Sequence, residues 1–223
     1  MAAKDGRGRP LTSIVRRRMA THTWVDLHMP EAQLLADLTG IKADLERARE
    51  TAQLLSKTMT AEKPDWSLVE PLSVAAAVAY SRPFMTGVRT RLGEDDLSTL
   101  SPVQREAHDR LRAYRDKHVA HSVNAYENNN PRAQYCVERV NEEGITAIGC
   151  SHGRVSGLSP SDIGNMTELA TLLINGVERR IKEEQARLLQ IVRNMPLEKV
   201  LTGGQGAFQI DHTTPIDQRR KKG

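Results

Sequence analysis

The stretch "MPEAQLLADLTGIKADLERARETAQLLSKTM", residues 29–59, carries a helical repeat along its whole length. Apolar residues return at steps of three and four, and charged residues occupy the opposite face. The repeating residues are Leu34, Leu35, Leu38, Ile41, Leu45, Ala48, Ala52 and Leu55. Pro30 stands where a proline suits the first helical turn. The pattern predicts a long helix that buries one face.

Two further helices are predicted before the middle of the chain. Residues 67–92 are apolar on nearly every side in "LSVAAAVAY", which predicts a central position, and Pro83 predicts a kink near Tyr80–Arg82. The next helix opens at Ser101, with Gln104 three residues on as its capping partner. It is expected to run through His118 and as far as Tyr126, where "NNNP" stops it.

The segment "AQYCVERVNEEGITAIGCSHGRV", residues 133–155, has the pattern of a β-hairpin. Apolar residues flank "NEEG" on both sides, and Gly144 is expected to supply the positive φ of the turn. Cys136 and Cys150 would then lie on opposite strands, either as a disulfide or, as a cytosolic setting favours, as reduced thiols. A last helix is predicted from about Pro160 to Asn194, with Ser159 as its cap.

Together these segments predict an all-α fold, an up-down four-helix bundle with a β-hairpin inserted before the last helix. The bundle is expected to span residues 24–196, between a disordered basic arm (1–23) and a flexible basic tail (197–223). The 223 residues carry a net charge of +4, and the surplus gathers at the ends, where it either holds phosphates or is merely solvated. No apolar run approaches the roughly 18 residues of a membrane span, which predicts a soluble, cytoplasmic protein that does not associate with a membrane.

One short stretch concentrates groups that can act on RNA. "RDKHVAH" contains Arg115, Asp116, His118 and His121 at the end of the third predicted helix. A neutral imidazole can take the proton of a ribose 2′-hydroxyl, and a guanidinium can stabilise the charge that develops on the phosphate. Arginine and histidine are therefore sufficient for RNA cleavage without a metal or another cofactor.

This stretch resembles the signature of the HEPN superfamily (higher eukaryotes and prokaryotes nucleotide-binding). In that signature an arginine and a polar residue precede a histidine by four to six intervening positions, and Arg115, Asp116 and His121 fit it. The surrounding "RDKHVAHS", the "AYSRPF" of residues 79–84 and the hairpin are similar to members from abortive-infection and toxin–antitoxin systems. Arg112 to His118 also fits the bare spacing, so the weight rests on this context.

The resemblance implies a homodimer in which Arg115 and His121 of both copies form a metal-independent ribonuclease site. The expected partners are RNA, a second copy of the chain and an antitoxin protein. Asp116 and His118 would support the site, His118 being a second candidate for the base. Tyr80 and Arg82 could line it as well, if Pro83 turns Arg82 inward.

Three alternatives remain open at the level of the sequence. A related helical module could bind nucleic acid, nucleotide or protein without cutting, and the stretch could simply be a basic helix end that complements the helix dipole. A metal site at His118 and His121 is disfavoured, because di-metal bundles need inward glutamates and the second helix offers only Glu70. His108 and Asp109 are expected to be solvated.

Overall fold

The computed structural model describes residues 23–119, 127–139, 144–155 and 157–201 of the chain. The described part is mainly helical, with one two-stranded antiparallel hairpin before the last long helix. The main elements are α1 (Gln33–Thr60), α2 (Val69–Ser81), α3 (Glu94–Leu97), α4 (Pro102–Tyr114), β1 (Glu127–Tyr135), β2 (Ile145–Arg154), α6 (Pro160–Arg193) and α7 (Leu197–Leu201). Short 3₁₀ turns are η1 (Pro30–Ala32), η2 (Trp66–Leu68) and η3 (Arg82–Phe84), and η4 (Arg115–Val119) is π-helical.

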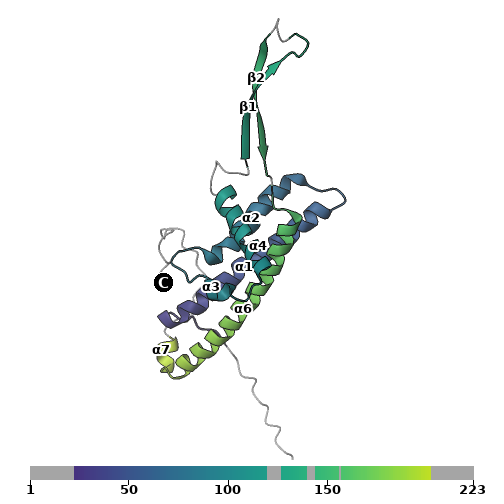
Figure 1. Ribbon diagram of the computed structural model, residues 1–223. Helices are drawn as coiled ribbons and strands as arrows, with labels where there is room; N and C mark the ends of the chain where they lie inside the picture. The colour runs from purple at the N-terminus through teal and green to yellow at the C-terminus, as the bar shows by residue number, and fades with distance from the viewer. Residues whose placement is uncertain (1–22, 120–126, 140–143, 156, 202–223) are drawn as a thin grey trace, which may run out of the picture.

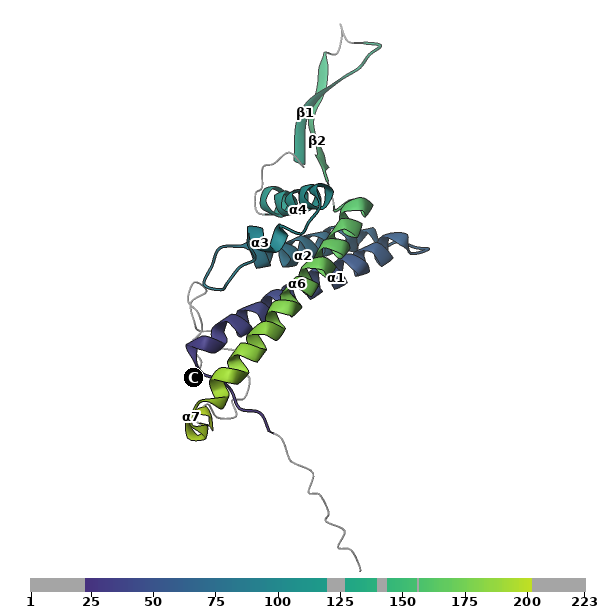
Figure 2. The same cartoon turned by 60° about the horizontal axis from the view of Figure 1, so that its bottom comes forward.

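The two longest helices, α1 and α6, form the axis of the helical body and run side by side (Figures 1 and 2). Their apolar stripes meet as the periodicity predicts, with Leu38, Ile41, Leu45, Leu169 and Val177 buried in one core. The predicted bounds of both helices agree with the structure to within a few residues. At the end from which the hairpin projects, α2 packs against α1, α4 packs against α6, and α2 and α4 pack against each other.

Helix starts follow the capping signals in the sequence. The Ser101 hydroxyl accepts from the Gln104 backbone N–H at 3.3 Å, and the Gln104 side chain accepts from the Ser101 N–H at 3.0 Å. Ser159 accepts from the backbone N–H of Asp162 at 3.1 Å. These side chains satisfy backbone donors that have no partner within the first helical turn.

The second predicted helix is shorter than the sequence pattern indicated. It ends at Ser81, and after the turn η3 the residues that were expected to continue it to 92 cross α1 without helical structure. Pro83 cannot donate the hydrogen bond that would carry the helix on. Two buried carboxylates of α1 hold the segment instead: Asp37 accepts from the Thr90 N–H at 2.9 Å, and Asp44 accepts from Arg89 Nη2 at 2.8 Å.

The hairpin is longer than predicted and is displaced toward the helical body. Asn128–Asn130 and Pro131, which were expected to stop a helix, belong to β1. Gly144 has φ 63°, as predicted for the turn region. Cys150 lies opposite Pro131, whereas Cys136 follows the end of β1, so the two cysteines do not face each other and both are free. A run of asparagines ends a helix but does not prevent pairing when strand partners are present.

No helix in the described ranges is long and apolar enough to cross a membrane. The predicted N-terminal arm lies outside the described residues except for Thr23. The predicted tail begins with α7, and its residues 202–223 lie outside the described part as well.

Candidate functional site

Arg115 stands at the point where α4 gives way to the π-helical turn η4. Its side chain is 28% exposed, so the guanidinium is accessible without being fully solvated. Arg115 Nη1 donates to Asp116 Oδ1 at 2.8 Å, which fixes the direction of the guanidinium. Asp116 also stands four residues after Arg112, a spacing at which helical side chains can pair, but it binds its immediate neighbour Arg115 instead.

The π-helical turn changes the geometry expected from the sequence. A regular α-helix would place residues three apart about 60° around the axis from one another. In η4 the i→i+5 bonding puts more residues in each turn. The backbone positions of Arg115 and His118 are therefore more than 60° apart around the axis. Turns of this kind occur mostly as single insertions in helices and are frequent at functional sites.

The two histidines of the motif are less completely defined. The backbone of His118 belongs to η4, but its side chain lies outside the described part. His121 lies outside the described residues altogether. The predicted pairing of Arg115 with His121 in one site therefore stays a prediction.

Tyr80 and Arg82 lie in different surroundings. Tyr80 is fully buried, and its hydroxyl is 2.9 Å from Nδ1 of His108. Arg82 is 54% exposed and lies 3.5 Å from Asp44 of α1. Pro83 ends the helix, and Arg82 lies at the surface beside a carboxylate, so a role for Tyr80 or Arg82 in lining the site stays a prediction.

His108 is a buried residue that the sequence analysis placed in solvent. It is 1% exposed and forms a three-ring cluster with Tyr80 and Phe84, whose centroids lie 5.8 and 4.6 Å from its own and 5.8 Å from each other. Burial is the largest cause of its lowered pKa of about 4; the Asp109 carboxylate opposes the shift, and the Arg112 guanidinium adds to it. Burial also raises the pKa of Tyr80. Both groups are neutral at physiological pH, and the spacing of His108 from Leu111 was the signal that could have placed it inside.

The aromatic cluster supports the end of α4 that carries Arg115. The Arg112 guanidinium lies over the Phe84 ring, 5.8 Å from its centroid, one turn before Arg115. Phe84 comes from η3, so "AYSRPF" and the end of α4 are packed against each other. These aromatic contacts pack the end of α4 that leads to Arg115 against η3.

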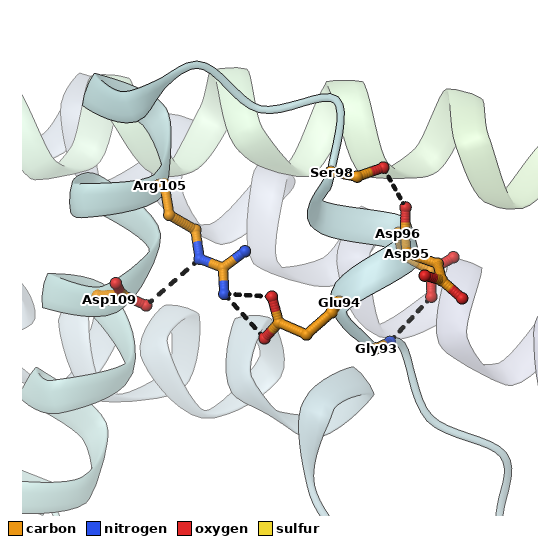
Figure 3. A network of polar contacts seen from close by, with 7 residues as sticks. All are labelled: Gly93, Glu94, Asp95, Asp96, Ser98, Arg105 and Asp109. Carbon is orange, nitrogen blue, oxygen red and sulfur yellow. Dashed lines mark hydrogen bonds and ion pairs between the residues drawn. The ribbon is translucent and has the colours of Figure 1, made fainter.

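The beginning of α4 is fixed by a separate polar network (Figure 3). Arg105 Nη2 binds both carboxylate oxygens of Glu94 on α3, at 2.8 and 2.6 Å, and its Nε lies 3.9 Å from Asp109. The Gly93 N–H donates to Asp96, which also accepts from Arg180 of α6 at 2.7 Å. These contacts join α3, α4 and α6, and so hold the helix that leads to Arg115.

Beside this network lies a cleft of about 740 Å³ between α3 and α6. Its lining combines polar residues (Arg91, Asp95, Asn175, Arg179 and Arg180) with apolar ones such as Leu173 and Val177, and includes none of the described predicted site residues. Within the described ranges no group of three or more histidine, cysteine, aspartate or glutamate side chains is arranged to hold a metal ion. No protein-family model, curated protein or solved structure matches the chain.

Proposed function

We propose that this chain is a metal-independent endoribonuclease with a HEPN-type helical bundle, acting as a toxin or phage-defence effector in the cytoplasm. The observation that supports it is the placement of Arg115: partly exposed, oriented by Asp116, and positioned at a π-helical turn that follows α4. The site is composite, formed by Arg115 and His121 of two copies at a homodimer interface. RNA is the substrate, and an antitoxin protein is the expected neutralising partner.

The proposed reaction divides its steps between the two residue types. The His121 imidazole removes the proton of a ribose 2′-hydroxyl, and the oxygen attacks the adjacent phosphorus. Arg115 binds the phosphate and stabilises its increased negative charge. The 5′-oxygen leaves with a proton from the second copy's histidine, which yields a 2′,3′-cyclic phosphate and a free 5′-hydroxyl. Asp116 keeps the guanidinium in place.

The test is RNA cleavage in EDTA by the wild type and by Arg115→Ala. We expect the variant to lose at least tenfold in rate, which corresponds to about 1.4 kcal/mol or more in the barrier. Arg110→Ala is the matched control, because Arg110 is a partly exposed arginine of the same helix, paired with Glu106 and Asp162. The cleavage rate of Arg110→Ala should stay within a factor of about two of the wild-type rate, which corresponds to a change of about 0.4 kcal/mol in the barrier.

The histidines are separated by a second pair of variants. His121→Ala should abolish cleavage while circular dichroism and oligomeric state stay those of the wild type. His118→Ala should retain cleavage if His121 is the base. Equal rates for the wild type and Arg115→Ala would refute the proposed site, and RNA binding without any cleavage would favour a non-catalytic binding module.

A further inference from the structure

The two faces of the hairpin differ sharply in chemistry. Strand register pairs Ala133 with Ile148 and Pro131 with Cys150, and a shift after Gln134 brings Ile145 opposite Tyr135. Because successive side chains of a strand point to opposite sides, one face combines these six residues. The other face carries only polar or small residues, namely Asn128, Asn130, Arg132, Gln134, Ala147, Gly149, Ser151 and Gly153.

The apolar side of the hairpin faces solvent. Ile148 is 75% exposed, Ile145 60% and Tyr135 53%. The hydrophobic core contains no residue of β1 or β2, and the hairpin projects away from the helices (Figures 1 and 2). A two-stranded ribbon alone is marginally stable in water, and contiguous exposed apolar patches mark interaction sites. This face therefore needs a partner.

We define the arm face as the residues on this side of the two strands: Glu127, Asn129, Pro131, Ala133, Tyr135, Ile145, Ile148, Cys150, His152 and Arg154. We propose that the arm face binds the arm face of a second copy, related by a twofold axis parallel to the strands. In this arrangement β1 of one copy lies over β2 of the other. Each residue then meets the residue that is its own ladder partner, across the usual spacing of packed sheets of about 10 Å.

The register makes this arrangement complementary in size and charge. The small Ala133 meets the large Ile148 of the second copy, and Tyr135 meets Ile145. At the base of the arm the Glu127 carboxylate faces Arg154 of the second copy, whose guanidinium also binds Glu70 of its own α2. A twofold axis across the strands would instead lay β1 on β1 and β2 on β2; an axis through this pair would set Ile148 on Ile148 beside Ala133 on Ala133, two large residues next to two small ones. The size pairs and the charge pair both favour the twofold axis that runs parallel to the strands.

The arrangement also places both helical bodies at the same end of the paired arms. Arg154 at the base donates to Glu70 of α2 at 2.6 Å, which ties the arm to the body. The parallel axis therefore brings together the ends of the two bodies that carry α2 and α4. This interface would hold together the two halves of the composite site, and in that respect the inference rests on the proposed function. Its evidence is the strand register, which does not depend on nuclease activity.

The experiment is sedimentation velocity on the full chain, over a dilution series. The wild type is expected to be a dimer, and Ile148→Glu should weaken association at least tenfold. Ala147→Glu is the matched control: it adds the same charge at the adjacent exposed residue, on the opposite face, and should associate as the wild type does. Ile148→Thr keeps a β-branched strand residue and should weaken association as well.

Each outcome decides the inference. A wild type that is monomeric at every concentration, an Ile148→Glu variant that dimerises normally, or an Ala147→Glu variant that dissociates equally would overturn it. Cleavage measured on the same samples separates the two proposals. A wild type that cleaves RNA with a normal Ile148→Glu dimer refutes only the arm interface, and an arm-dependent dimer without cleavage refutes only the nuclease.

Discussion

His108 shows how a polar residue can be a core residue. Its ring is enclosed by Tyr80 and Phe84, and its Nδ1 is satisfied by the Tyr80 hydroxyl. Leaving a buried polar group without its partner lowers the free energy of unfolding by about 1–3 kcal/mol. Removing either member of the pair is therefore expected to destabilise the fold. The sequence places His108 three residues from Leu111, on the buried side of α4, but nothing in the sequence identifies Tyr80, which lies 28 residues earlier, as its partner.

The lowered pKa of His108 predicts a specific acid sensitivity. In the unfolded chain the histidine takes up a proton below pH about 6.5, whereas in the folded protein it does so only near pH 4. Between these values the unfolded state binds more protons, so the free energy of unfolding falls as the pH falls. From pH 7 to pH 5 the wild type should lose roughly 2 kcal/mol more than His108→Gln, measured by urea unfolding. Identical pH dependence of the two proteins would contradict this.

At the scale of elements, the long amphipathic helices were predictable because their apolar residues repeat over many turns. The helix caps at Ser101 and Ser159 were predictable for another reason: a capping signal consists of a few neighbouring residues. Pro83 marks the end of α2 in the sequence, but the course of residues 85–92 depends on carboxylates of α1, and the extent of the hairpin depends on strand pairing. Both are contacts between distant segments. The π-helical turn at Arg115 had no sequence signal that we recognise.

The connection between β2 and α6 predicts a second stability effect. A Cβ added at Gly157 would lie 2.8 Å from Cγ1 of Val69 and 2.9 Å from the hydroxyl of Ser73. That hydroxyl cannot easily move, because it donates to the Val69 carbonyl and accepts from the Leu158 N–H. We expect Gly157→Ala to lower the free energy of unfolding by about 1–3 kcal/mol in urea denaturation.

Gly164 of α6 provides the matched control for this substitution. A Cβ there would meet nothing within 4 Å, and alanine is the better helix former. Gly164→Ala should therefore raise the free energy of unfolding by roughly 0.5–1 kcal/mol. A Gly157→Ala protein as stable as the wild type would show that α2 can move away at no cost.

The whole molecule divides into a helical body with its own core and an arm that adds nothing to that core. The sequence predicted this composition of helices and one hairpin, but not the projection of the arm, because a strand pattern does not say what its faces meet. The motif histidines illustrate the same limit. Their types and spacing are visible in the sequence, and their relation to Arg115 depends on the irregular turn between them.

This division predicts that the body folds without the arm. Replacing residues 128–153 by a short Gly/Ser linker should leave the helical circular dichroism signal and cooperative unfolding intact. The midpoint temperature should match that of Ile148→Glu, since both variants lack the proposed association but retain the same core. Loss of cooperative unfolding in the linker variant alone would show that the arm stabilises the body.

The strict alternation of the arm also restricts how its length can change during evolution. Two residues added to each strand would extend both faces and preserve their chemistry. A single residue gained or lost within one strand would exchange the faces beyond that point and turn isoleucines toward the asparagine side. Descendants of this chain should therefore differ in arm length by residue pairs, or carry a compensating bulge such as the one already present between Gln134 and Tyr135.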